Sequence, residues 1–308
     1  MSDFSNPIFH DETAAREWLE ARLWPNGPVC PHCATVGEAT LMQGKSHRPG
    51  LYQCNACREP FTVTVGTLYE RSKIPLHKWL AATHLMMASK KGMSALEIGR
   101  LLGFSKKTAW FVCHRIRESL RPLNPEPLGG EGKVVEMDEM YIGGKEKNKH
   151  ASKRLNAGRG AVGKEAVFSL VERGGKVRSH HVPSVSAGNL KSILKEQVAA
   201  ETRLMSDEAA TSAAAAVGFS HAAVNHSIGE YVRGDIHTNT QEGYFSIFKR
   251  GVMGTFHHVS PQHLKRYLAE FDFRYNEREA LGVNDAERFN RAIPGIVGKR
   301  LTYRRIDG

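Results

Sequence analysis

The spacing of apolar residues divides the chain into an N-terminal helical part and a later part where strands and helices alternate. Helical periodicity predicts one helix over residues 11–24, capped by Asp11, and another over 75–92. Between them lie turn-rich pieces flanked by strand-forming residues. From residue 134 onward, runs of β-branched and aromatic residues are typical of strands. The chain therefore combines an all-helical region with an α/β region.

Two neighbouring helices in the first part fit a DNA-binding pattern. Ser94 can cap a short helix and Ser105 a longer one, with a break at Gly103 between them. Two helices joined by such a turn match the helix-turn-helix pattern, whose second helix enters the major groove. That second helix is predicted to bury Ala109, Phe111, Val112 and Ile116, and to present Lys106, Lys107, His114, Arg115 and Arg117. An ordinary helical hairpin with a solvated basic face explains the same pattern.

A proline- and glycine-containing linker near residue 125 leads into the α/β region. Its first predicted strand is Val134–Ile142, ended by Gly143 and Gly144, and three strands precede a regular alternation of helix and strand. This order is typical of a mixed-sheet domain of the ribonuclease H kind. The remaining predictions are a hairpin around 174–175, a helix capped by Ser186, a strand over 202–206, an alanine-rich helix after Asp207, a strand at 224–227, a helix over 239–251 and a long last helix that starts at Pro261. The predicted regions are 1–66, 67–122 and 123–308.

Composition narrows the class of partner. The 308 residues are enough for two or three domains, and the net charge of +11 favours a polyanion such as nucleic acid. No long uncharged apolar run predicts a membrane span, and the N-terminus lacks the basic start and apolar core of a signal peptide. We therefore expect a protein that acts on DNA in the cytoplasm and has no membrane partner.

Four of the five cysteines form two closely spaced pairs, Cys30 with Cys33 and Cys54 with Cys57. Two such pairs about twenty residues apart are typical of a tetrahedral four-cysteine zinc site, as in a zinc ribbon. Four thiolates leave no open position for substrate, so the predicted zinc is structural. Disulfides or a redox pair are the alternatives. Cys113 is interpreted as a buried small hydrophobic residue.

Three acids stand where predicted elements end. Asp138 lies in the first strand of the α/β region, Asp207 ends a later strand, and Glu242 lies in the first turn of a helix. Each has an ordinary explanation: a solvent-facing strand residue, a helix N-cap, and a capping box that starts at Asn239. Together they can converge at one sheet edge and hold the divalent cations that phosphodiester transfer requires. Glu136 shares the strand face of Asp138 and is a candidate to support the ligands.

Basic residues surround these acids in the sequence. A glycine-bearing basic segment follows the first strand, and two further cations lie about two turns beyond Glu242. A solvated loop explains the segment by itself, whereas contact with nucleic-acid phosphates explains it beside a metal site. The candidate phosphate-binding residues are Lys145, Lys147, Lys149, Lys153, Arg154, Lys249 and Arg250.

Long stretches of the chain resemble a known family. The two cysteine knuckles, the segment 136–160 and the segment 230–278, with the acid at Asp207, are similar to bacterial insertion-sequence transposases of the zinc-ribbon DDE type, the ISXO-like superfamily. The resemblance implies a ribonuclease H-like fold, with Asp138, Asp207 and Glu242 as the catalytic triad and Mg²⁺ or Mn²⁺ as the catalytic ion. It also implies a homo-oligomer in the complex with DNA ends.

The expected function is binding of insertion-sequence ends, followed by metal-dependent cleavage and strand transfer through two-metal transesterification. Two alternatives share some of the features. One is a zinc-ribbon, helix-turn-helix regulator, which would not need three acids at converging positions. The other is a metal-dependent nuclease that cuts without joining, and the residues themselves hardly distinguish it from a transposase.

Overall fold

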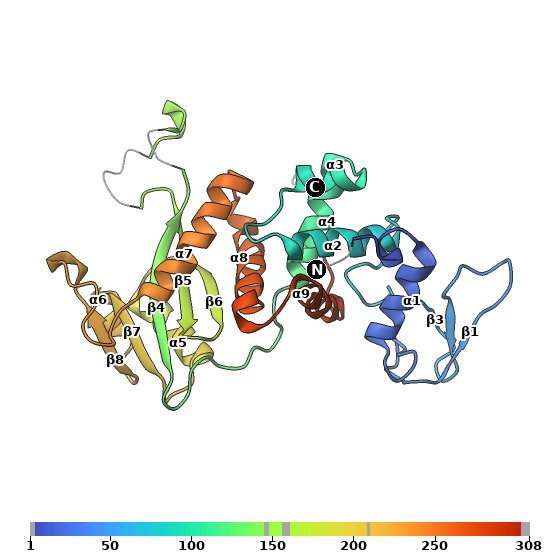
Figure 1. Cartoon of the computed structure of the whole chain (residues 1–308), viewed down its shortest axis with the longest axis horizontal. Coiled ribbons are helices and arrows are strands. Elements are labelled where there is room, and N and C mark those ends of the chain that lie inside the picture. Colours follow the sequence, from blue (N-terminus) through green and yellow to red (C-terminus); the bar gives the residue numbers. More distant parts are fainter. Residues whose placement is uncertain (1–3, 145–147, 156–160, 208–209, 303–308) are drawn as a thin grey trace. The chain divides into compact units, whose positions relative to one another are not determined.

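A computed structural model describes residues 4–302 apart from 145–147, 156–160 and 208–209. Contacts between residues divide the chain into two compact units (Figure 1). One unit contains residues 1–122 together with 277–308, and the other contains residues 123–276. The third predicted region, 123–308, therefore differs from the observed units, because its last residues pack with the N-terminal part of the chain. No helix among the described residues is long and apolar enough to cross a membrane.

The first unit begins with a short 3₁₀ turn, Pro7–Phe9, and helix α1, Glu12–Leu23. Asp11 caps α1 as predicted, because its Oδ1 accepts a hydrogen bond from the Ala14 amide at 2.7 Å. A small antiparallel sheet follows, in the order β1-β2-β3. Its strands are Ala39–Leu41, Tyr52–Cys54 and Pro60–Phe61.

Three helices continue this unit: α2 (Leu76–Ala88), α3 (Ala95–Leu102) and α4 (Lys106–Ser119). The Ser94 and Ser105 side chains cap α3 and α4, which confirms both predicted starts. Gly103 ends α3 in the left-handed conformation, with φ of 70°, where a side chain would be strained. The predicted pair of helices therefore exists.

The predicted surface of α4 is partly wrong. His114 and Arg117 are buried, not presented to solvent. Arg115 is half-buried, and its guanidinium donates hydrogen bonds to the carbonyl oxygens of Leu68, Glu70 and Leu301. Residues after 292 return to cover α4, and a sequence pattern within α4 alone does not reveal this cover. Lys106 and Lys107, at the start of the helix, are exposed as predicted.

A further helix at the C-terminal end was missed by the sequence analysis, which took the helix at Pro261 to be the last. Helix α9, Asp285–Ala292, packs on α2 and lies between two 3₁₀ turns, Glu279–Leu281 and Ile293–Ile296. Its Phe289 stacks on Trp18 with ring centroids 5.2 Å apart and also contacts the ring of His84. Residues 277–302 therefore complete the core of the first unit.

The second unit is built on one mixed sheet in the order β6-β5-β4-β7-β8. Strands β4, β5 and β6 are antiparallel neighbours, whereas β7 and β8 run parallel to β4. The strands are Val134–Ile142, Glu165–Glu172, Val177–Val182, Arg203–Asp207 and Ser220–Val224. The last strand lies earlier than the predicted 224–227, so that prediction is wrong. The mixed sheet itself is consistent with a ribonuclease H-like domain, as predicted.

Helices cover both faces of this sheet (Figure 1). Met137 and Phe168 face a core shared with α5 (Ala187–Gln197) and α6 (Ala210–Ala215). Met140 and Val167 face the opposite core, shared with α7 (Asn239–Gly251) and α8 (Pro261–Asn276). A π-helical turn, Val252–Phe256, follows α7, and short 3₁₀ turns lie at Ala151–Lys153 and His226–Ile228. Successive residues of β4 therefore look toward different layers.

Candidate active site

The central strand and its parallel neighbour bring the first two acids together. The β4–β7 register pairs Val134 with Arg203 and Glu136 with Met205. Asp138 and Asp207 each lie two residues further along, so both stand at the carboxyl end of the parallel pair. In open α/β sheets this end is where ligands bind. The predicted convergence of these two acids follows directly from the register.

Glu242 reaches the same region from helix α7. The N-cap of α7 is Thr238, so Asn239 is already the first helical residue. The Thr238 side chain makes no capping hydrogen bond to the first turn of α7. The capping box considered for Asn239 and Glu242 does not form either. Glu242 is exposed and is free of a capping role. Its position in the structure therefore favours ligand binding over helix capping.

Asp138 and Glu242 line one open pocket of about 810 Å³. Glu139 contributes a third carboxylate to this pocket, and Lys249 and Arg250 contribute two cations. The remaining lining residues are Phe245, Ser246, Met253 and Gly254. The sequence analysis did not select Glu139 or Met253, although the adjacency of Glu139 to Asp138 was a usable signal.

Burial and mutual repulsion perturb the acids. Burial raises the pKa of Asp138 to about 7, and the negative charges of Asp207, Glu139 and Glu242 add to the shift. The Glu139 amide opposes the shift by donating a hydrogen bond to Asp138 Oδ1 at 2.7 Å. Burial also raises the pKa of Glu139, again with a contribution from Asp207. A bound cation would reduce this repulsion and stabilise the ionised form of the carboxylates.

The residues present fit a hard divalent ion. All of the pocket acids are oxygen donors, which Mg²⁺ prefers. Glu139 Oε2 is a buried atom with no hydrogen-bond partner among the described residues, and such atoms are rare unless something else satisfies them. No three of the described carboxylates lie within 4.8 Å of one another, a spacing that only the four cysteines reach as a group among the described ligand residues. A bound cation would draw the acids closer.

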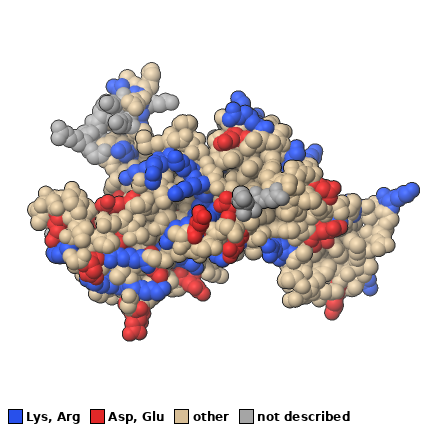
Figure 2. Space-filling view, in the orientation of Figure 1, with Lys and Arg blue, Asp and Glu red and all other residues tan. Residues whose placement is uncertain are grey.

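The predicted phosphate-binding residues divide into two groups. Lys249 and Arg250 are exposed at the pocket, and Figure 2 shows Lys and Arg side chains gathered over the region of α7. Arg154 is exposed, and its guanidinium donates to the carbonyl oxygen of Lys149. Lys145 and Lys147 lie outside the described residues, as does the side chain of Lys153.

The four paired cysteines form the predicted second site, in the first unit. Their sulfur atoms all lie within 4.8 Å of one another, and Cys30 Sγ is 3.7 Å from Cys57 Sγ. A tetrahedral zinc with bonds of about 2.3 Å requires sulfur atoms roughly 3.8 Å apart. The donor set therefore fits a structural zinc ion. Cys113 is buried elsewhere in this unit, as predicted.

The mixed sheet and the four-cysteine ribbon are consistent with the domain organisation of a zinc-ribbon transposase. The model of the ISXO2-like transposase domain matches residues 127–276, and that of the transposase zinc-ribbon domain matches residues 10–59. An uncharacterised protein in the transposable element ISH50 of Halobacterium salinarum is 30% identical over 278 residues, covering 86% of this chain and 91% of that protein. The chain therefore belongs to the ISXO2-like family of insertion-sequence transposases. Membership supports a transposase role and implies that DNA is a partner.

Proposed function

We propose that this protein binds the ends of an insertion sequence, cuts them and joins them to target DNA. The observation that carries the proposal is the electrostatic coupling of Asp138 with Asp207 and Glu242, which come from three different elements. Structural ion pairs place opposite charges together, whereas this site places like charges together and partly buries them. Such an arrangement suits a site that holds cations.

Asp138, Asp207 and Glu242 would hold two Mg²⁺ or Mn²⁺ ions. When bound, these ions activate the attacking oxygen and stabilise the leaving oxygen of a phosphodiester. In the first step water attacks the phosphorus, and the bond to the 3′ oxygen of the element end breaks. In the second step the freed 3′-hydroxyl attacks a target phosphate and displaces a target 3′ oxygen. Lys249 and Arg250, exposed beside the acids, bind the phosphates of the strand being transferred.

The α3–α4 pair would recognise the element end. Lys106 and Lys107 lie exposed in the first turn of α4, the part of a recognition helix that contacts base edges. Arg115 is a weaker candidate, since its guanidinium is already hydrogen-bonded to three carbonyl oxygens. Joining requires two ends to be held together, so we propose that the active form contains more than one copy of this chain.

The decisive experiment replaces Glu242 by glutamine. Glutamine keeps the size and the hydrogen-bonding capacity of glutamate but removes the charge that a divalent ion needs. We expect Glu242→Gln to bind element-end DNA normally and to lose cleavage and joining by ~100-fold or more. Labelled element-end duplexes incubated with Mg²⁺ or Mn²⁺ and target DNA report both steps in one assay.

Asp138→Asn and Asp207→Asn should behave in the same way as Glu242→Gln. Normal turnover by any of the three would remove that residue from the metal site. Cleavage without any joined product from the wild-type protein would identify a nuclease instead. Joining that survives complete chelation of divalent ions would refute the mechanism.

A further inference from the structure

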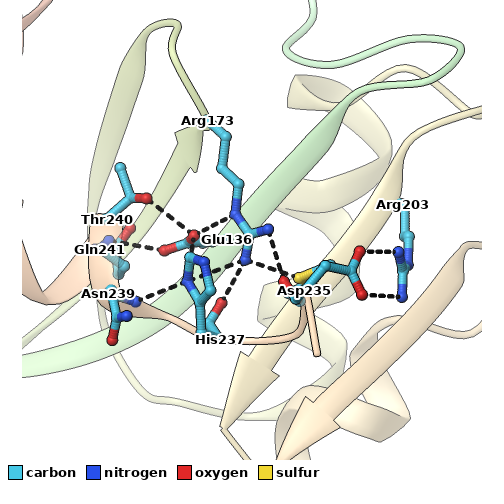
Figure 3. Close-up of polar contacts among 9 residues, drawn as sticks. Glu136, Arg173, Arg203, Asp235, His237, Asn239, Thr240 and Gln241 are labelled. Atoms are coloured by element: carbon cyan, nitrogen blue, oxygen red, sulfur yellow. Dashed lines mark hydrogen bonds and ion pairs between the residues drawn. The ribbon is translucent and has the colours of Figure 1, made fainter. Parts of the chain in front are cut away.

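A fully buried carboxylate connects the strand of the first acid to the helix of the third. Glu136 lies in β4, two residues before Asp138, and its side chain is 0% exposed. Its Oε2 accepts a hydrogen bond from the backbone N–H of Gln241 at 2.9 Å, and its Oε1 accepts one from Thr240 Oγ1 at 3.0 Å (Figure 3). Helix α7 is therefore capped by a residue of the sheet, not by its own N-cap side chain.

Arg173 extends the connection to the remaining segments. Its Nε donates to Glu136 Oε1 at 2.6 Å, and its Nη2 lies 3.0 Å from the sulfur of Met205 in β7. The same guanidinium donates to the carbonyl oxygens of Asp235 and His237, in the segment that leads into α7 (Figure 3). One arginine thus contacts β4, β7 and the approach to α7.

Each of the three acids of the proposed active site lies within two residues of Glu136 or of a residue that the ion pair contacts. Asp138 is two residues from Glu136, Asp207 is two residues from Met205, and Glu242 follows Gln241. We propose that Glu136 and Arg173 are positioning residues, whose ion pair sets the separation of the three acids for binding divalent cations. This inference rests on the proposed function, because it concerns the same site.

Physical reasons favour a positioning role over a purely stabilising one. Burial removes the hydration of the Glu136 carboxylate, so this ion pair adds little net stability compared with apolar side chains of similar size, although 23% of the Arg173 side chain stays exposed. The hydrogen bonds of the pair are directional, however, and they join β4, β7, the first turn of α7 and the segment that leads into α7. A carboxylate at a helix N-terminus also satisfies backbone amides that would otherwise lack partners. Residues that orient metal ligands typically change metal affinity by about 10–100-fold when they are mutated.

The test replaces both charges, so that neither is left without its partner. In Glu136→Leu with Arg173→Met, the apolar side chains fill similar space and the fold should persist. The matched control is Glu270→Leu with Arg274→Met, since that buried ion pair joins two successive turns of the single helix α8. Both variants are prepared as full-length, zinc-loaded protein.

Two measurements distinguish positioning from stability. Electron paramagnetic resonance of free Mn²⁺ during titration gives the affinity of the protein for the ion without any catalytic assay. Hydrogen exchange gives the protection of the amides in the first turn of α7. For the Glu136/Arg173 variant we expect Mn²⁺ affinity to fall by ~10-fold or more and the α7 amides to exchange faster. For the Glu270/Arg274 variant we expect wild-type Mn²⁺ affinity.

Unchanged Mn²⁺ affinity in the Glu136/Arg173 variant would overturn the inference. An equal loss in the control variant would also overturn it, since any disturbed ion pair would then suffice. If the double variant fails to fold, Glu136→Gln, which keeps the side-chain shape, is judged by the same two outcomes. Asp138→Asn serves as the reference: if it binds Mn²⁺ normally, the proposed metal site itself fails, independently of Glu136.

Discussion

The negative charge of Asp138 should destabilise the protein when no metal ion is bound. The side chain is largely buried beside other acids, and its pKa rises from the ordinary value of 3.8 to about 7. Between these values the folded protein binds the Asp138 proton more tightly than the unfolded chain does. The free energy of unfolding therefore falls as pH rises through this window, and it stays lower above pH 7. Asp138→Asn carries no charge and should avoid this loss.

The size of the effect follows from the shift. A change of about three pKa units at 1.36 kcal/mol each corresponds to ~4 kcal/mol. The neighbouring acids titrate together with Asp138 and take up part of this energy, so we expect a gain of ~2 kcal/mol for the asparagine variant at pH 8. For a unit of this size, that gain raises the melting temperature by roughly 4–8 °C.

Thermal unfolding of the second unit, with divalent ions chelated, measures this gain. The difference between Asp138→Asn and wild type should vanish below about pH 3, where Asp138 is protonated in both the folded and the unfolded state. It should also shrink or reverse in Mg²⁺, because the ion stabilises only the charged site. Asp272 provides a contrast within the same unit: burial also raises its pKa, to about 6, but Tyr244 and Ser179 donate hydrogen bonds to it. Asp272→Asn should therefore lower stability at every pH. If Asp138→Asn were no more stable than wild type at pH 8, the reasoning about charge repulsion would be refuted.

The other expected results concern the first unit. Cys54→Ser should release the zinc and unfold the ribbon, because the binding energy of a structural zinc is largely folding energy; metal analysis with circular dichroism checks this, and an intact zinc-free ribbon would contradict it. Reversing the charges of Lys106 and Lys107 should weaken binding to element ends and flatten its salt dependence; unchanged binding at several salt concentrations would exclude α4 as the reader. Phe289→Ala should destabilise this unit by about 3–5 kcal/mol in denaturant unfolding while leaving the second unit's transition in place. A loss below ~1 kcal/mol would mean that α9 is not part of the core.

Local signals in the sequence were sufficient for most elements. The capping serines of α3 and α4 and the glycine after α3 act within a few residues, so the sequence analysis located both helices. The position of Asp207 at the end of its strand was also correct. The misplaced strand at 224–227 has a similar local origin, since the observed β8, Ser220–Val224, contains histidine and alanines and lacks a clear strand pattern.

Long-range contacts explain what the sequence analysis missed. Arg115 looks like a surface cation by its position on α4, but its guanidinium donates hydrogen bonds to carbonyl oxygens of Leu68, Glu70 and Leu301, which lie far away in the chain. Glu136 is a candidate only by its strand face, and its two partners in α7 lie more than one hundred residues away. No periodicity within β4 indicates that such a residue caps a helix. The ribbon cysteines were easier to predict, because the ligands of a structural zinc site occur at characteristic short spacings in the sequence.

The division of the chain has a consequence for its synthesis on the ribosome. The second unit is continuous, whereas the first unit is completed only by residues that are translated after the second unit. The nascent chain therefore exposes the apolar face of α2 and the ring of Trp18 while the whole second unit is made. A message truncated after residue 276 would encode an intact second unit attached to an unfinished first one. Copies of the element that carry a stop codon at this point would then produce chains that keep the acids but are prone to aggregation and degradation.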